Sequence, residues 1–99
     1  FEVLNRLKQS GITIIIVEND PPRLAQIADR MVLIRDTRIM HDTCPREFFK
    51  LLYGDERIKL PQVSQAYLDT FGIQKVHEGS ELPMSVDEGV KAYGKVANY

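Results

Sequence analysis

Three adjacent polar residues, Glu18, Asn19 and Asp20, offer the clearest candidate chemistry in this sequence. A carboxylate accepts hydrogen bonds, and an asparagine amide can both donate and accept them. The three residues directly follow six consecutive β-branched residues, 12–17. In open α/β sheets, ligands bind beyond the carboxyl ends of the strands. The position of this triplet therefore predicts a candidate site at the end of a strand.

Residues 12–17 are the strand that would position this site. β-Branched side chains are restricted about χ1 and favour strands. The run has no polar alternation, which indicates burial on both faces, as in a parallel sheet covered by helices. We expect a helix before it that ends at Gly11, and a helix over residues 21–30 after it, with Asp20 as the N-cap.

The next segment predicts a second strand and a hairpin. Residues 31–34 form an apolar strand, which we expect to run parallel to residues 12–17 after a right-handed crossover. Asp36 and Thr37 then predict a short turn into an antiparallel strand over residues 38–41. Together these elements predict the α/β fold class.

The remaining residues predict a helical region. One helix is expected over residues 45–53, with Phe48, Phe49 and Leu52 facing inward. A polar connector over residues 55–61 divides the chain into regions 1–54 and 55–99. A second helix is expected from residue 62, a loop over residues 74–83, and a last helix that starts in a capping box of Ser85 and Glu88. The side chains expected to be buried by these two helices are Val63, Ala66, Tyr67, Phe71, Val86, Val90 and Tyr93.

Composition excludes several classes of function. A net charge of −1 gives no reason to expect a nucleic-acid partner, and the single cysteine, Cys44, excludes an internal disulfide. No apolar run approaches the roughly 20 residues of a transmembrane helix, and no signal peptide is evident. His41 and His77 have no metal-ligand spacing with Cys44 or with each other, so we expect no metal site. The arginines are scattered, which indicates solvated or ion-paired charges.

Taken together, the residues resemble the C-terminal part of an ABC-type ATPase, a P-loop NTPase. In that family, a strand ends in a Thr-His-Asp switch loop, and a helix ending in Ala-Asp-Arg, a β-hairpin and a Gly-x-Pro-x-Glu helix follow. The matching residues are Leu7-Lys8-x-x-Gly11-Ile12-Thr13-Ile14-Ile15-Ile16-Val17-x-x-Asp20, Ala28-Asp29-Arg30, Arg38-Ile39 and Pro45-Arg46-Glu47-Phe48-Phe49.

The tail resembles the C-terminal extension of energy-coupling-factor ATPases, which serve cobalt, nickel and vitamin importers. Its matching residues are Leu60-Pro61-Gln62-Val63-Ser64-Gln65, Leu82-Pro83 and Ser85-Val86-Asp87-Glu88. The resemblance implies ATP and Mg²⁺ as cofactors of the parent protein. It also implies three partners: the missing N-terminal part of the ATPase, a second ATPase subunit and a transmembrane coupling subunit. The implied location is the cytoplasmic face of the cell membrane.

Several departures from the family pattern bear on activity. Asn19 stands at the switch-histidine position and Glu18 at the preceding threonine, while Thr37 and Thr43 replace two expected glycines. The phosphate-binding Gly-rich loop, the signature motif and the metal-binding acidic strand end are absent, and we expect them upstream of Phe1. The fragment alone is therefore expected neither to hydrolyse ATP nor to bind nucleotide tightly, because phosphoryl transfer needs a phosphate cradle and a held Mg²⁺.

Three functional hypotheses remain open from the sequence. The first is a fragment of an importer ATPase in which Asn19 contacts nucleotide. The second is a non-catalytic interaction or dimerisation module, carried by residues 55–99. The third is a degenerate ATPase subunit, which the loss of the histidine favours. A simpler alternative for residues 18–20 is a loop that only caps the next helix.

Overall fold

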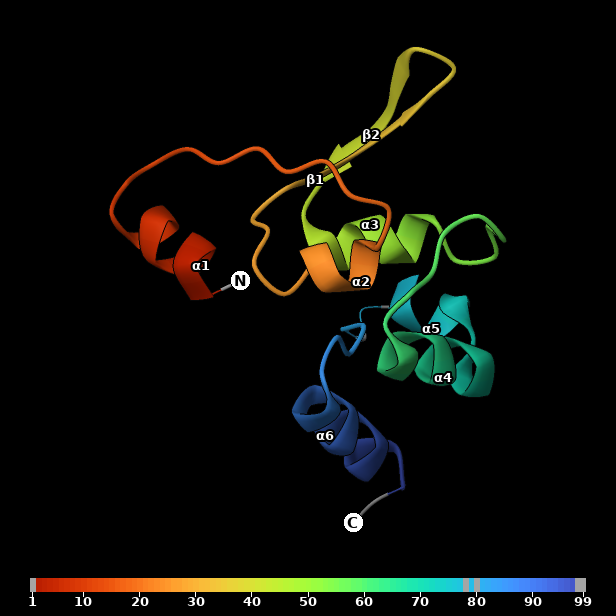
Figure 1. Ribbon diagram of the computed structural model, residues 1–99. Helices are drawn as coiled ribbons and strands as arrows, with labels where there is room; N and C mark the ends of the chain where they lie inside the picture. Colours follow the sequence, from red (N-terminus) through yellow and green to blue (C-terminus); the bar gives the residue numbers. More distant parts are fainter. Residues whose placement is uncertain (1, 78, 80, 98–99) are drawn as a thin grey trace.

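The computed structural model describes residues 2–77, 79 and 81–97, the last five of these by their backbone alone. Figure 1 shows a group of short helices below a projecting hairpin, with the first helix set apart at the end of a long connection. The elements in chain order are α1 (Glu2–Gln9), α2 (Pro21–Leu24), β1 (Met31–Arg35), β2 (Arg38–Thr43), α3 (Pro45–Leu51), α4 (Gln62–Phe71), α5 (Ile73–His77) and α6 (Val86–Ala97).

The predicted central strand over residues 12–17 does not form. These residues run as an unpaired connection between α1 and α2 (Figure 1), and the described sheet contains β1 and β2 alone. Ile15 is 89% exposed and Val17 is 97% exposed. A strand needs hydrogen bonds to a neighbouring strand, and no described strand pairs with this segment. The prediction of a buried parallel strand is therefore wrong for this chain.

The predicted helix over residues 21–30 is also shorter than expected. Asp20 caps α2 as predicted, since its side chain accepts a hydrogen bond from the Arg23 backbone N–H at 3.4 Å. The helix ends at Leu24, and the chain continues in single turns up to Ala28, whose N–H donates to the Leu24 carbonyl at 2.9 Å. The expected crossover between two parallel strands is absent because its first strand does not form.

The predicted hairpin is confirmed. Strands β1 and β2 pair antiparallel, with Arg35 opposite Arg38 and an irregularity after Leu33. The two turn residues, Asp36 and Thr37, have φ values of 51° and 63°. Positive φ at both central residues is typical of two-residue hairpins of type I′, whose twist matches that of the flanking strands.

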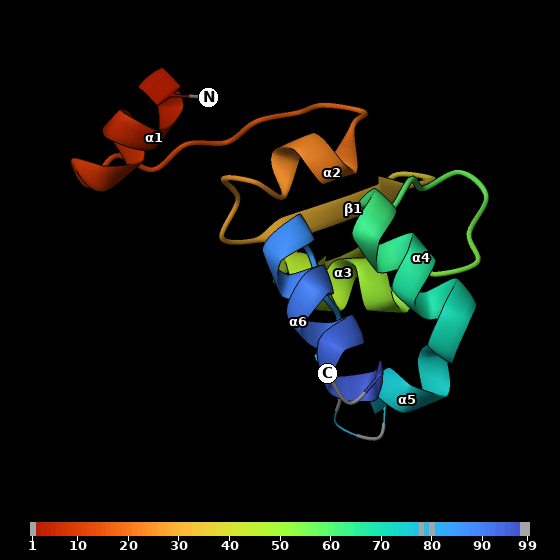
Figure 2. The same cartoon turned by 90° about the horizontal axis from the view of Figure 1, so that it is seen from below.

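The hydrophobic core lies below the hairpin, where α3 contacts the C-terminal helices. Figure 2 shows α3, α4, α5 and α6 grouped together, with α1 well apart from them. Phe48 and Phe49 of α3 are buried as predicted, as is Leu52 directly after this helix. The core draws residues from both sides of residue 54; its buried members are Met31, Phe48, Phe49, Leu52, Leu60, Tyr67, Leu68, Val76 and Leu82.

The predicted inner faces of α4 and α6 need correction. In α4, Tyr67 is buried as expected, but Ala66 is exposed, and Ser64 and Leu68 are buried in addition. Ser64 can be buried because its hydroxyl donates to the Pro83 carbonyl at 2.6 Å.

In α6, the predicted inward residues Val86 and Val90 are exposed, and the side chain of Tyr93 lies outside the described residues. The packed side of α6 carries Gly89 instead, which faces Val63 of α4. The predicted loop over residues 74–83 also begins as α5, with Val76 buried. Apolar spacing alone did not distinguish the two sides of α6.

Candidate functional site

The loop Glu18-Asn19-Asp20 is held from both sides by Arg23. The Arg23 backbone N–H donates to Asp20, and its guanidinium lies 3.8 Å from the Glu18 carboxylate. Asn19 lies between these two contacts at a bend in the chain and is exposed. Within the described residues, the Asn19 side chain makes no hydrogen bond. The loop therefore presents one neutral amide to solvent, which can donate or accept a hydrogen bond but cannot transfer a proton as an imidazole does.

An open groove lies beside this loop. Its lining residues come from α2 with its cap and from the chain around the start of α4: Asp20, Pro22, Arg23, Gln26, Lys59, Leu60, Pro61 and Gln62. The lining carries charges of both signs and two side-chain amides. The groove thus connects the helix that follows Asn19 with the first of the C-terminal helices.

The other candidate residues do not assemble into a reactive cluster. His41 is half-buried on β2, His77 is exposed at the end of α5, and Cys44 is exposed at the N-cap of α3. In the part of the chain that the structure describes, no three His, Cys, Asp or Glu side chains converge as metal ligands would. These residues therefore occupy separate places in the fold.

Two arginines of the hairpin region form close ion pairs, as the sequence indicated. Arg30 donates two hydrogen bonds to Asp42, at 2.5 Å each, and this contact lowers the pKa of Asp42. Arg35 donates to Asp55 at 2.6 Å, and Asp55 also accepts from the Arg57 backbone N–H at 2.9 Å. These hydrogen bonds lower the pKa of Asp55 to about 2, and the hydrogen bond from Arg35 has the larger effect. Both ion pairs stabilise the hairpin region.

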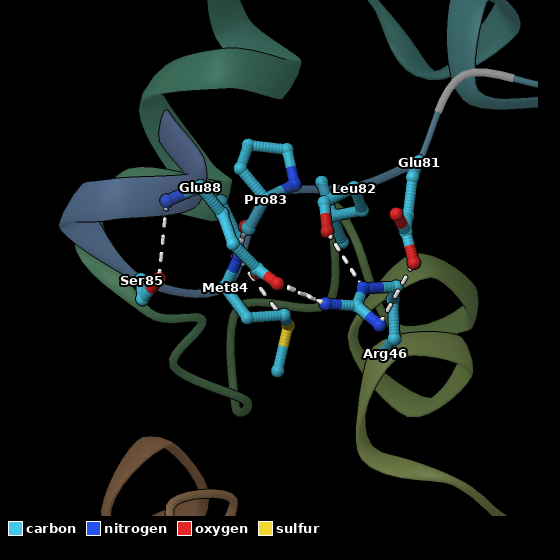
Figure 3. A network of polar contacts seen from close by, with 8 residues as sticks. Arg46, Glu81, Leu82, Pro83, Met84, Ser85 and Glu88 are labelled. Atoms are coloured by element: carbon cyan, nitrogen blue, oxygen red, sulfur yellow. Dashed lines mark hydrogen bonds and ion pairs between the residues drawn. The ribbon is translucent and has the colours of Figure 1, made fainter. Parts of the chain in front are cut away.

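Arg46 of α3 is the centre of a larger polar network (Figure 3). Its guanidinium donates two hydrogen bonds to the Glu88 carboxylate, at 2.9 and 2.7 Å, and one to the Leu82 carbonyl at 2.9 Å. A third partner, Glu81, lies 3.0 Å away. This network was not predicted from the sequence, because Arg46 and Glu88 are 42 residues apart and the spacing of Ser85 and Glu88 indicated only local capping.

The network also corrects the predicted capping box. The Glu88 backbone N–H donates to the Ser85 hydroxyl at 3.2 Å, as expected for an N-cap. The Glu88 carboxylate, however, accepts from the Met84 N–H at 2.8 Å rather than from Ser85. This backbone hydrogen bond and the contact with Arg46 lower the pKa of Glu88, although desolvation acts in the opposite direction. Glu88 therefore joins the start of α6 to α3.

Comparison with known proteins finds a similarity to one characterised transport protein. Over 69 residues, the chain is 32% identical to the high-affinity branched-chain amino acid transport ATP-binding protein BraG of Pseudomonas aeruginosa. The similarity is to an ABC transporter ATPase. The matched stretch covers 69% of this chain and 25% of BraG, so the chain spans about a quarter of this relative. No protein-family model matches the chain, and no solved structure matches it.

The similarity supports a general ABC ATPase fragment without distinguishing a subtype. The α/β character and the hairpin come from the structure itself, whereas the ABC ATPase relation comes from this relative. Across the described residues, no helix has both the length and the apolar character that a membrane crossing requires.

Proposed function

We propose that the chain is the C-terminal part of the ATP-binding subunit of an energy-coupling-factor ABC importer. The parent protein would couple ATP hydrolysis to the uptake of cobalt, nickel or a vitamin. The observation that carries the ATPase assignment is the 69-residue similarity to BraG. The subtype is supported by the tail residues Leu82-Pro83 and Ser85–Glu88, which resemble the extension of that group. Two of these residues, Leu82 and Glu88, accept hydrogen bonds from Arg46.

In this proposal Asn19 is the residue of the chain nearest to the chemistry. Bound ATP and Mg²⁺ supply the transferable phosphoryl group and the charge neutralisation that hydrolysis requires. Asn19 fits the edge of such a site in one respect: its amide is exposed and makes no hydrogen bond within the described residues. It would donate one neutral hydrogen bond toward a phosphate oxygen. The Glu18 and Asp20 contacts with Arg23 would hold the loop that presents it.

The proposed partners follow from the same assignment. They are the rest of the ATPase, a second ATPase subunit and a transmembrane coupling subunit, which would hold the protein at the cytoplasmic face of the membrane. The exposed apolar residues of the N-terminal half support the first of these. In this part of the chain they are Val3, Leu7, Ile12, Ile15, Ile16, Val17, Val32, Ile34, Ile39 and Met40. Contiguous exposed apolar surface usually marks an interface, and Ile15, Ile16 and Val17 supply an unbroken run of it.

A degenerate ATPase subunit is the second candidate, and Asn19 is the observation that favours it. An asparagine at this position cannot carry a charge as an imidazole can. In a two-subunit ATPase, one weakly active half would tolerate this replacement. The two candidates differ in turnover, and they agree on fold and on partners.

The test uses the full-length polypeptide that contains these residues. We expect it to bind ATP with Mg²⁺, to co-purify with a membrane-embedded partner, and to support uptake of cobalt, nickel or a vitamin in cells. Uptake of branched-chain amino acids instead would keep the ATPase assignment and reject the energy-coupling-factor subtype. Nucleotide binding without turnover would favour the degenerate subunit. Absence of nucleotide binding would reject both.

A further inference from the structure

The segment Ala28-Asp29-Arg30 connects two parts of the chain through adjacent, opposite charges. Arg30 pairs with Asp42 of the hairpin, as described above. Asp29 pairs instead with Lys8 of α1, whose Nζ lies 2.8 Å from the Asp29 carboxylate. Ala28 packs against the hydrophobic core. The segment is therefore an anchor on the core to which both the hairpin and α1 are attached.

Lys8 makes a second contact beside this segment. Its Nζ also donates a hydrogen bond to the Ile27 carbonyl at 2.9 Å, in a partly buried position. The Lys8 side chain is 38% exposed, against 76% for Arg6 on the same helix. One ammonium group thus has two acceptors at short distances, which makes its geometry more specific than that of a single surface ion pair.

The other contacts of α1 in the described structure do not fix its position. None of the residues of α1 is buried, and no described residue before Leu24 packs against the core. Among the described residues, the remaining side-chain hydrogen bonds of α1 are local, such as that from Arg6 to Glu2 at 3.2 Å. The position of α1 relative to the core therefore depends on Lys8.

This dependence extends to the candidate site, because Lys8 closes a loop around it. Lys8 and Ile27 are 19 residues apart, and residues 18–20 lie between them, at the end of the long connection from α1 (Figure 1). While the contact is made, both ends of this loop are held. Without it, α1 and residues 12–17 would be attached only through α2 and would be free to rotate about the bend at Asn19.

We propose that Lys8 is a positioning residue: it holds α1 on residues 27–29 and thereby sets the direction of the loop that carries Asn19. Loss of this contact should raise the ratio of open to closed molecules about fivefold or more, the usual range for a charged hydrogen bond combined with an ion pair. The inference does not depend on the proposed ATPase function, because neither the contact nor its test involves nucleotide.

Distances between pairs of spin labels test the contact in the 99-residue chain. One label is attached to Cys44, which is exposed at the N-cap of α3. The other is attached to Asn5→Cys on α1, or to Ile15→Cys in the connection, and both of these positions are exposed. We expect one dominant distance for each pair when Lys8 is present. Lys8→Met removes the charge and keeps an unbranched side chain, and it should broaden both distributions.

Further variants separate the contact from a general effect of substitution. Lys8→Arg should keep the narrow distributions, because a guanidinium can donate to both acceptors. Lys8→Glu and Asp29→Lys should each broaden them, whereas the double variant should be narrower than either, because the ion pair is restored with its charges exchanged. Arg6→Met is the matched control and should change neither distance, since the Arg6 ion pair lies within α1. Circular dichroism checks that each variant keeps its helices.

Three results would overturn the proposal. Broad distributions for both label pairs with Lys8 present would show that the contact does not hold α1. Unchanged distributions in Lys8→Met would assign the position of α1 to other contacts. A change at Asn5 without a change at Ile15 would mean that Lys8 holds α1 and leaves the direction of the Asn19 loop unaffected.

Discussion

At residue 19, the chemistry of a single side chain decides how active the proposed ATPase would be. In the full-length parent, we expect Asn19→His to raise ATP turnover by about 10²–10³, the usual effect of one charge-stabilising or positioning contact in a transition state. ATP affinity should change little, because it would depend mainly on the phosphate-binding loop expected elsewhere in the parent. The measurement is steady-state ATPase activity, with nucleotide affinity determined separately.

Asn19→Ala is the control for this substitution. If the asparagine amide makes a productive hydrogen bond, the alanine variant should be slower than wild type. If wild type and both variants turn over equally, residue 19 has no catalytic role. Glu18-Asn19-Asp20 would then act as a loop and helix cap, a role for which the Asp20 contact with Arg23 is already in place.

Thr37 occupies a backbone conformation that suits glycine. Its φ of 63° is unfavourable for a β-branched residue, and the resembled family has glycine in this turn. We expect Thr37→Gly to stabilise the chain by about 1 kcal/mol, since relief of strain exceeds the added flexibility of the unfolded chain. The measurement is the free energy of unfolding in urea.

Thr43→Gly is the matched control for Thr37→Gly. Thr43 is the last residue of β2 and does not have positive φ. Glycine there should destabilise the strand, because glycine disfavours extended structure. A loss of stability in both variants would show that the turn at Thr37 is not strained.

At the level of elements, the hairpin and α3 were predicted correctly from neighbouring residues, whereas the helix predicted over residues 21–30 ends at Leu24. The hairpin follows from two apolar strands around Asp36 and Thr37, and α3 follows from Pro45 with its buried aromatic pair. The prediction of a strand over residues 12–17 failed because a strand also needs a neighbouring strand to pair with, and the amino-acid types of one segment do not reveal whether that neighbour is present. Their β-branched side chains favour extended backbone, and that preference alone does not make a sheet.

For the polar contacts, too, the sequence predicted those between near neighbours and missed those between distant residues. The cap at Asp20 depends on residues three apart and was correct. The Arg46 network depends on Glu81, Leu82 and Glu88, which lie far along the chain. Spacing rules describe one helix or strand at a time, so they gave no signal for these contacts. The same limit explains why Val86 and Val90 were assigned to the wrong side of α6.

Asp55 joins the end of the hairpin to the connector after α3, and its pKa predicts a pH dependence. The folded value, about 2, lies below the ordinary 3.8, so the folded state favours the charged carboxylate. This stabilisation is fully present above pH 4 and is lost as the pH falls toward 2. We expect Asp55→Asn to lower the free energy of unfolding at pH 7, with the difference nearly gone at pH 2.

Urea denaturation of wild type and Asp55→Asn across this pH range measures the effect. Glu56→Gln is a suitable control, because Glu56 is adjacent and exposed. It should change the free energy of unfolding little at any pH. A difference for Asp55→Asn that is the same at pH 7 and at pH 2 would show that the ion pair with Arg35 does not contribute.

At the scale of the whole molecule, the chain is extended for its length. Its radius of gyration is 14.7 Å, against about 13 Å for a compact domain of 100 residues. The excess comes from α1, the unpaired residues 12–17 and the projecting hairpin (Figures 1 and 2). The buried core is confined to β1, α3 and the helices after it.

This distribution predicts marginal stability for the isolated 99-residue chain. We expect it to bind an apolar dye such as ANS strongly and to exchange the backbone amides of residues 13–18 rapidly, because they lack strand partners. Amides in α4 should exchange far more slowly. Hydrogen exchange read by mass spectrometry makes the comparison within one sample. A sharply cooperative melt with protected amides at residues 13–18 would contradict this expectation.

The Arg46 network has a consequence for the order in which the chain folds. Residues 42 positions apart must meet before Arg46 can bind Glu88, whereas the hairpin closes over a few residues. Contacts so distant in sequence carry a higher entropic cost of closure and tend to form late. Arg46→Gln should therefore accelerate unfolding by roughly fivefold to tenfold and leave the folding rate nearly unchanged.

Stopped-flow folding and unfolding in urea measure the two rates. Slower folding in Arg46→Gln would mean instead that the network is already formed in the transition state. If unfolding alone changes, the C-terminal helices dock onto α3 last and leave it first. The attachment of α6 is then set by the lifetime of its contact with α3 and not by how fast that contact forms.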